Sequence, residues 1–190
     1  MAGSTSPYSF AGSLAQGNAE ALFPVLVAQV LEPGFPVIYG FDPTPTDMHS
    51  GEVRYYPPDK MLFLIASGQI GRYYGLPYRG IFVGSMVERF DPQMGIENVL
   101  FALACLATKQ NLVSSLGSCF NANGVSPEKI IVDDALAELV ERLCQGFEMD
   151  DLHLGIDTIH KVGPGGHFLG EEMTRDLLRS GEFFDHITDC

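Results

Sequence analysis

Apolar residues recur at helical spacing in four stretches of the chain, and each stretch follows a short apolar or small-residue run. The spacing predicts a first helix over about Ser13–Leu31, which Pro24 should bend or interrupt. A second helix is expected to run from Pro58 to Tyr74, and the third and fourth to begin near Asp91 and Ser126. Helices that alternate with short apolar runs are typical of an α/β protein.

The third helix has the clearest start, because Asp91 is placed to cap it and Pro92 fits its first turn. One apolar stripe is expected to form the inner face of each of the last two long helices. The stripes are Ile96, Leu100, Leu103 and Leu106 in the third helix, and Val132, Leu136, Leu139 and Leu143 in the fourth. Two shorter helices are predicted over about 150–161 and 171–180, separated by the glycine-rich run 163–166.

Four short strands are predicted to begin near Met1, Pro36, Tyr78 and Asn111, so that each strand and helix together form one βα unit. The strands lack clean alternation, as in a parallel sheet that is covered on both faces. An open doubly wound sheet and part of a barrel both fit this series. A complete (β/α)₈ barrel usually takes about 250 residues, so 190 residues favour half of a (β/α)₈ TIM-type barrel with C-terminal helices. Residues 1–148 are expected to form the four units, and 149–190 a helical tail that completes the same domain.

A half-barrel exposes two strand edges and the inner faces of its strands, which is an association hazard. The chain also starts in a predicted strand, with no helix before it. We therefore expect a partner to cover these surfaces, either a complementary N-terminal barrel half or a second copy in a homo-oligomer.

Charge and composition exclude several classes of partner. With 24 acidic and 11 basic residues the formal net charge is −13, and no basic stripe occurs, so neither nucleic acid nor an anionic membrane is expected to bind. A hydrophobic content of 46% against 18% charged residues excludes a disordered chain. The first ten residues do not resemble a signal peptide, and no apolar run is expected to reach the ~18 residues of a membrane helix, so a cytoplasmic location is predicted.

The cysteines and histidines predict no metal site. Cys105, Cys119, Cys144 and Cys190 contain no CxxC pair, and the His and Cys spacing makes no zinc set. Cys105 and Cys144 fall on apolar helical faces and are expected to be buried, reduced thiols. The glycine-rich run GPGGHFLG follows a helix rather than a strand, so it is not expected to cradle a phosphate, and no HExxH, GxSxG or Walker motif occurs.

Six segments nevertheless form a recognisable series. They read AGSTSPYSFAGSLAQGNAEAL (2–22), PGFPVIYG (33–40), RYYGLPYRG (72–80), DPQMGIE (91–97), SPEKIIVDD (126–134) and DTIHKVGPGGHFLGEEMTRDLL (157–178). In this order they resemble the C-terminal half of the trimethylamine methyltransferase family, which are corrinoid-dependent (β/α)₈ enzymes that demethylate amines and betaines. The resemblance extends almost from end to end of the chain. One departure is Glu88, in the run Ser85–Glu88, where the family has a basic residue.

The resemblance implies that the barrel presents a methylated amine or a quaternary ammonium compound, such as a betaine, to a corrinoid (cobalamin) held by a separate protein. No cofactor is expected to bind tightly to this chain itself. Some members carry pyrrolysine, whereas this chain has only standard residues, which points to quaternary amines. A quaternary nitrogen is already cationic and leaves as a neutral amine, so positioning in a cage of aromatic faces and carboxylates is sufficient. The competing interpretation is a truncated, non-catalytic binding or assembly protein that pairs half-barrels.

Candidate substrate-binding residues follow from the strand ends of a parallel barrel, where its sites collect. Tyr39 and Phe41 can wall a cationic ligand, although ordinary aromatic packing competes with this role. Asp47 lies in the loop that follows, and Glu88 follows the strand that begins at Tyr78. No catalytic residue is predicted.

Three further candidates come from the family-like motifs. Gln93 and Glu97 lie in DPQMGIE on one helix face, where the alternative for Glu97 is a solvated side chain. His167 lies in GPGGHFLG, where glycines permit close backbone approach, and a structural histidine is the alternative.

Overall fold

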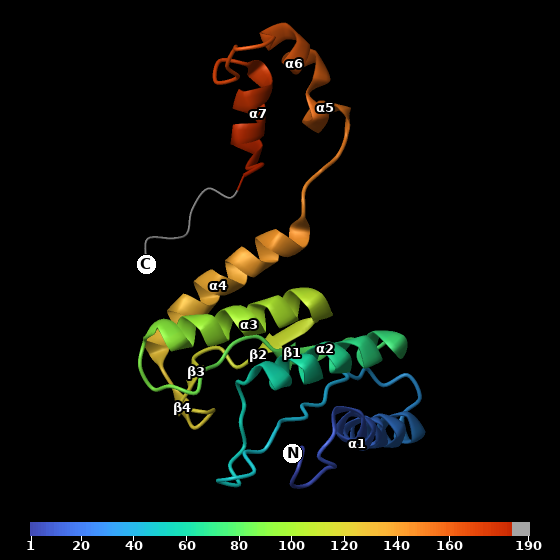
Figure 1. The fold of residues 1–190 in the computed structure, drawn as a ribbon. Coiled ribbons are helices and arrows are strands. Elements are labelled where there is room, and N and C mark those ends of the chain that lie inside the picture. Colours follow the sequence, from blue (N-terminus) through green and yellow to red (C-terminus); the bar gives the residue numbers. More distant parts are fainter. Residues whose placement is uncertain (184–190) are drawn as a thin grey trace. The chain divides into compact units, whose positions relative to one another are not determined.

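The computed structural model describes residues 1–183, and they form two compact units, Met1–Val140 and a second unit that begins at Glu141 (Figure 1). Each unit has internal packing of its own. The assignment of residues 149–190 to the same domain as residues 1–148 stays a prediction. Cys190 lies outside the described residues.

Several extended segments of the first unit pair in parallel, and short antiparallel pairs also occur. Strand β1 (Arg79–Ile81) pairs in parallel with β2 (Leu112–Ser114), with Gly80 opposite Val113. Single parallel bridges join Tyr39 to Tyr78, and Ala2 to Pro45. All four predicted strand segments therefore take part in parallel pairing, which confirms the α/β class. The continuous ladder is shorter than the sequence predicts, since each of its strands has three residues.

Four helices accompany these segments: α1 (Phe10–Leu31), α2 (Pro58–Tyr73), α3 (Pro92–Thr108) and α4 (Pro127–Gln145). Helix α2 packs against α1, α3 and β1 (Figure 1). The cap of α3 is as predicted, because the Asp91 carboxylate accepts a hydrogen bond of 3.0 Å from the backbone N–H of Met94. Pro24 lies inside α1 but does not end the helix.

The apolar stripe predicted for α3 is half right. Leu100 and Leu106 pack against the core, but Ile96 and Leu103 are 64% and 56% exposed. The buried face instead includes Met94 and Phe101, together with the polar residue Asn98. Apolar residues occupy several sides of α3, so the pattern does not select the inner face. The inner face of α3 is determined by its polar side chains, which form hydrogen bonds with the loops after the strands, as described below.

The stripe predicted for α4 is also only partly right, since Leu136 packs against the core. Val132 and Leu143 are exposed, whereas Lys129, Asp133 and Val140 are buried. The buried Lys129–Asp133 ion pair lies on the side of α4 that faces the first unit's interior. The expected burial of Cys105 in α3 is confirmed, but Cys144, near the end of α4, is exposed.

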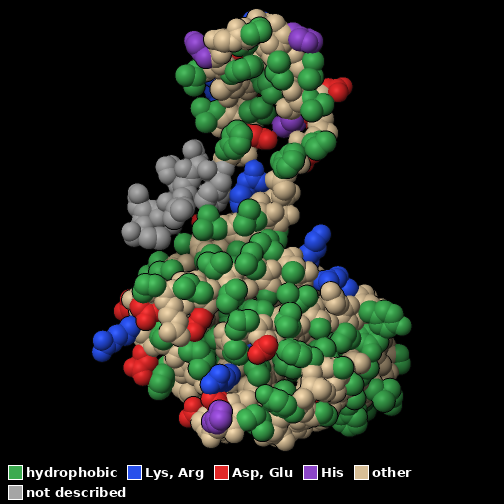
Figure 2. Space-filling model, in the orientation of Figure 1, with side chains coloured by type: hydrophobic (Ala, Val, Ile, Leu, Met, Phe, Trp, Pro, Cys, Tyr) green, Lys and Arg blue, Asp and Glu red, His purple; other side chains and the backbone are tan. Residues whose placement is uncertain are grey.

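Helix α1 is apolar on all sides, and none of its most apolar 18-residue window is buried. By length and composition alone it is able to cross a membrane, contrary to the expectation that no run is long enough. A core helix of a soluble protein or an N-terminal signal sequence meets the same criterion, so the observation is weak. In Figure 2 hydrophobic side chains crowd the part of the first unit that lies over α1.

The second unit contains three short helices, α5 (Asp151–Leu154), α6 (Ile156–Val162) and α7 (Glu172–Ser180). Gly155 takes the left-handed conformation at φ 58° and divides the single helix predicted over 150–161 into two. An apolar cavity of about 430 Å³ lies among the three helices.

Candidate functional site

The loops that follow β1 and β2 are joined to each other. Ser85 and Ser118 each lie four residues beyond the paired residues Ile81 and Ser114. The backbone N–H of Asn121 donates to the carbonyl of Ser85 at 3.0 Å. The carboxyl ends of the two parallel strands are thus held together by direct hydrogen bonds.

Asn121 also forms hydrogen bonds with a third loop, which precedes α2. Its side-chain amide donates to the carbonyl of Val53 at 2.7 Å, and its Oδ1 accepts from the N–H of Tyr55 at 3.2 Å. Phe120, Asn121 and Ala122 all have positive φ values, 50°, 51° and 65°. They connect β3 (Ser118–Cys119) to β4 (Gly124–Val125). Consecutive left-handed residues other than glycine are costly and occur mainly where the surrounding contacts fix a functional loop.

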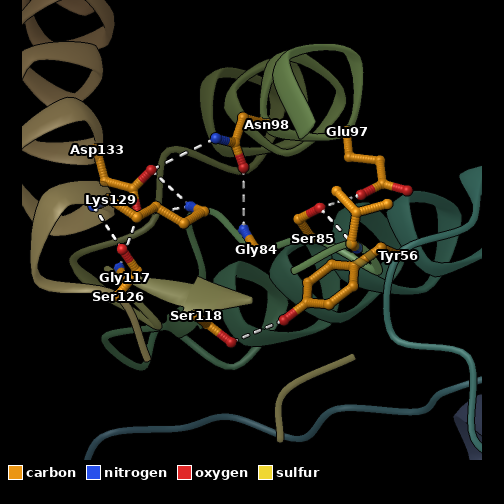
Figure 3. Close-up of polar contacts among 11 residues, drawn as sticks. Tyr56, Gly84, Ser85, Glu97, Asn98, Gly117, Ser118, Ser126, Lys129 and Asp133 are labelled. Atoms are coloured by element: carbon orange, nitrogen blue, oxygen red, sulfur yellow. Dashed lines mark hydrogen bonds and ion pairs between the residues drawn. The ribbon is translucent and has the colours of Figure 1, made fainter. Parts of the chain in front are cut away.

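A buried carboxylate lies at the end of β1. Glu97 on α3 is 8% exposed, and its Oε2 accepts from the Ser85 hydroxyl at 2.6 Å and from the N–H of Met86 at 2.9 Å (Figure 3). Its Oε1 accepts from the Gln93 side chain at 2.9 Å. Glu97 is therefore not the solvated side chain of the alternative interpretation, because three donors fix both of its oxygens.

A buried tyrosine lies at the end of β2. The Tyr56 hydroxyl is 2.9 Å from the Ser118 hydroxyl (Figure 3), and its ring packs edge-on against Phe101 at a centroid distance of 5.2 Å. Burial raises the pKa of Tyr56 to about 12, and the hydrogen bond to Ser118 opposes that shift only in part. The phenol is thus held neutral at physiological pH.

The extended segment at Tyr39, which bridges to Tyr78 just before β1, is followed by a residue in an ion pair. Lys60, in the first turn of α2, is fully buried and pairs with the Asp42 carboxylate. Its ammonium also donates to the Pro43 carbonyl at 2.9 Å and to the Thr44 hydroxyl at 2.7 Å. Burial lowers the pKa of Lys60, and the charge of Asp42 opposes that shift. The Asp42 side chain remains 30% exposed, so it can meet a ligand.

A second ion pair supports these strand ends from α4. Lys129 and Asp133 are both fully buried and lie 2.6 Å apart. Asp133 accepts from the N–H of Gly117 at 2.7 Å and from the Asn98 side chain at 3.4 Å. Asn98 in turn accepts from the N–H of Gly84 at 3.3 Å (Figure 3). One polar chain therefore fixes the backbone just before Ser85 and just before Ser118.

The predicted aromatic pair lies apart from these bonds. Tyr39 and Phe41 meet edge-on at a centroid distance of 5.7 Å. The Tyr39 hydroxyl donates to Asn18 of α1 at 2.6 Å, and burial raises its pKa. Phe41 and Asp42 line a small pocket of about 120 Å³ together with α1. The role of Tyr39 in substrate binding stays a prediction.

The remaining predicted residues are dispersed. Asp47 pairs with Arg54, and the N–H of His49 and that pairing lower the pKa of its carboxyl. Glu88 is exposed, and His167 is exposed in the second unit. Within residues 1–183, no group of three or more His, Cys, Asp or Glu side chains is arranged to hold a metal ion.

Sequence reasoning missed several polar residues near the strand ends, namely Lys60, Tyr56, Asn98, Lys129 and Asp133. Two signals were present. Lys60 begins an apolar helical run, where a lysine needs a partner if it is buried. Lys129 and Asp133 are four apart on a helix, which is the spacing of an ion pair.

These contacts define an α/β protein whose polar groups gather at the carboxyl ends of parallel strands, the usual place for ligand sites in such folds. The model of the trimethylamine methyltransferase (MTTB) family matches residues 1–190, and the chain belongs to this family.

Three relatives are representative. The chain is 39% identical over 176 residues to a glycine betaine methyltransferase of Desulfitobacterium hafniense and 32% identical over 179 residues to a proline betaine:corrinoid methyltransferase of Eubacterium limosum. It is 30% identical over 178 residues to the trimethylamine methyltransferase MttB of Methanosarcina barkeri. These matches cover 92–94% of this chain but only 36–37% of each relative. The chain thus spans little more than a third of the length of these relatives.

Proposed function

We propose that this chain is the C-terminal part of a (β/α)₈ barrel that presents a methylated amine or quaternary ammonium compound for methyl transfer to a corrinoid protein. The observation that carries the proposal is that Asp42, Glu97 and Tyr56 are each held in place at the end of one of the parallel segments, by Lys60, Ser85 and Ser118 in turn. Membership of a family whose relatives act on betaines and trimethylamine supports this substrate class.

The barrel part of the proposal rests on strand order. The segments at Tyr39, Tyr78–Ile81 and Leu112–Ser114 are parallel neighbours in chain order, as a barrel wall requires. The first segment bridges in parallel to Pro45, and four such segments can form half of an eight-stranded wall. The residues of β2 are half-buried to exposed, with Leu112 48% and Val113 38% exposed. An additional barrel segment, on the same or another polypeptide, would cover such an edge.

The groups at the strand ends suit a cationic substrate. The carboxylates of Asp42 and Glu97 supply negative charge, and Tyr56 supplies a neutral ring and hydroxyl. Carboxylates and aromatic faces in a partly desolvated site attract quaternary ammonium groups. Phe41, Gln93 and Glu97 retain their predicted roles in substrate binding as part of this proposal.

The corrinoid is proposed to come from a partner protein in the cytoplasm and to accept the methyl group. The proposed role of this chain is to bind the amine, to orient one of its methyl groups toward the corrinoid protein and to exclude water. Glu97, with three hydrogen bonds, is already fixed in orientation, which reduces the cost of ordering the complex.

The test uses a chimera in which this chain replaces the matching 37% of the Desulfitobacterium hafniense glycine betaine methyltransferase. Calorimetry with glycine betaine, proline betaine and trimethylamine should detect binding of at least one of the three. Asp42→Asn should weaken that binding about tenfold, since it removes one charge from the site. The matched control is Glu138→Gln, at an exposed residue of α4 outside the candidate site, which should leave binding unchanged. A folded chimera that binds none of these amines would contradict the proposal and would favour the non-catalytic assembly protein, which the relatives do not support.

A further inference from the structure

Asn121 forms hydrogen bonds with the loops that follow two other parallel segments. It lies between β2 and α4, and its backbone N–H donates at 3.0 Å to the Ser85 carbonyl in the loop after β1. Its side chain meets Val53 and Tyr55, which lie between the segment at Tyr39 and α2. One residue therefore joins the loops at the carboxyl ends of three parallel neighbours.

The side-chain amide of Asn121 replaces the peptide group of a neighbouring strand. Its Nδ2 donates to the Val53 carbonyl at 2.7 Å, and its Oδ1 accepts from the N–H of Tyr55 at 3.2 Å. A carbonyl and an N–H two residues further on are the pair that one residue of a parallel neighbour bonds in a sheet. Both contacts are needed together, so the side chain must supply a donor and an acceptor, as an amide does.

The backbone of this turn depends on contacts with the other loops. Asn121 has a φ of 51°, in the left-handed region that asparagine adopts more readily than most residues with a side chain. Phe120 and Ala122 beside it also have positive φ values, and such a run persists only when the surroundings fix it. The N–H of Phe120 donates to the Val87 carbonyl at 3.0 Å, which is a second bond to the loop after β1.

The loops joined in this way carry groups of the proposed amine site. Tyr56 follows Tyr55 directly, and the Ser85 hydroxyl donates to Glu97 at 2.6 Å. A Cβ at Gly84 would overlap the ring and hydroxyl of Tyr56, so the phenol lies directly against the backbone that precedes Ser85 (Figure 3). A shift of Tyr55 therefore moves the phenol relative to the serine that orients Glu97.

We infer that Asn121 is a positioning residue of the proposed amine site, which keeps the Tyr56 phenol in register with the Ser85–Glu97 pair. Asn121 acts through Tyr55 on one side and through the Ser85 carbonyl on the other. The inference rests on the proposed function for what the site binds. The joining of the loops does not depend on that function and can be measured without a ligand.

Hydrogen exchange of the 190-residue chain, followed by NMR, tests the joining of the loops. Asn121→Gly keeps the left-handed backbone and its N–H but removes the amide. It should speed exchange of the Tyr55 amide about tenfold or more, because its hydrogen bond is lost. The Met86 amide, which donates to Glu97, should exchange about threefold faster or more, because the loop after β1 is loosened. The matched control is Asn123→Gly, at an exposed residue whose side chain donates within the same turn, and it should change neither rate.

Kinetics of the chimera test the positioning. With glycine betaine as donor and reduced cobalamin as acceptor, Asn121→Gly should lower kcat about tenfold and change KM less than about threefold, because orientation is lost while the charges that bind the amine remain. Asn123→Gly should change neither constant. In combination with Glu97→Gln, Asn121→Gly should lower kcat little further, because the carboxylate that it serves is already gone. A purely structural role would give additive losses.

Asn121→Asp is the second variant. It keeps the oxygen that accepts from Tyr55 and tolerates a positive φ, but its carboxylate cannot donate to Val53. It should reproduce both effects of Asn121→Gly. A Met86 amide whose exchange neither Asn121 variant changes would overturn the inference, and so would a kcat that neither variant lowers. If the parent chimera transfers no methyl group, the proposed function fails, and the exchange rates alone decide whether Asn121 joins the loops.

Discussion

The Nζ of Lys129 lies 2.6 Å from both carboxylate oxygens of Asp133, and neither side chain is exposed. Lys129→Met leaves a buried carboxylate without its cation, so we expect the free energy of unfolding to fall by about 3–5 kcal/mol. Lys129→Met combined with Asp133→Asn should recover much of that loss, because no charge then remains buried. Urea denaturation measures both variants.

The control for this prediction is Lys161→Met. Lys161 pairs with Glu171 at 2.5 Å, but its side chain is 69% exposed, and such a pair contributes about 1 kcal/mol or less. A Lys129→Met variant that is no less stable than Lys161→Met would show that the Lys129–Asp133 pair is not structural.

Lys60 should be protected from chemical modification. Its ammonium is fully buried and bonded to Asp42, Pro43 and Thr44, so an acylating reagent can reach it only after local opening. Under native conditions mass spectrometry should find Lys161 acylated and Lys60 unmodified, and both modified in urea. Equal rates of modification in the native protein would refute the burial of Lys60.

The buried phenol of Tyr56 should make stability depend on alkaline pH. Folding raises its pKa from 10.0 to about 12, so the folded state retains a proton that the unfolded chain releases. The stabilisation is therefore complete below pH 10 and is lost as the pH rises from 10 toward 12. Tyr56→Phe should cost about 1 kcal/mol at pH 8 through the lost bond to Ser118 and should flatten the alkaline decline. Urea denaturation at several pH values measures this, with the exposed Tyr8→Phe as control; an unchanged decline in Tyr56→Phe would contradict the prediction.

His153 should titrate above its ordinary range. Its Nδ1 lies 2.6 Å from the Asp150 carboxylate and its Nε2 lies 3.6 Å from Glu182, and the hydrogen bond to Asp150 is the main cause of its raised pKa. The contribution of this contact is complete below pH 6.5 and is lost as the pH rises through the raised value. The pKa of the Asp150 carboxyl is lowered, so the contact also weakens as that group is protonated in acid.

An NMR titration of the imidazole tests the His153 prediction. Asp150→Asn should lower the pKa of His153, and Glu182→Gln should lower it less, since the Glu182 charge is a smaller cause of the shift. If neither variant moves the titration, the contact does not form in solution.

The sequence predicts where helices begin more reliably than which side they bury. The start of α3 follows from one capping carboxylate and one proline, which are local features, and Asp91 does cap the helix. The buried sides of α3 and α4 follow instead from Asn98, Glu97 and Asp133, whose partners lie in distant loops. Hydrophobic periodicity predicts that the most apolar side of a helix is buried, and it carries no information about contacts with distant loops.

The candidate site was predictable to a similar degree. Strand order placed the site at the carboxyl ends, and the motif DPQMGIE indicated Glu97, which is indeed fixed there by Ser85. Lys60 and Tyr56 were not foreseen, because burial makes them notable and burial is a tertiary property.

Methyl transfer by the chimera tests the central claim most directly. With glycine betaine as donor and reduced cobalamin as acceptor, the absorbance change on methylation reports the rate. Glu97→Gln should lower that rate about tenfold or more, because it disturbs the carboxylate that Ser85, Met86 and Gln93 hold in place. The exposed control Glu138→Gln should change it less than about twofold. A folded, amine-binding chimera that transfers methyl groups equally fast in the parent, Glu97→Gln and Glu138→Gln forms would contradict the account.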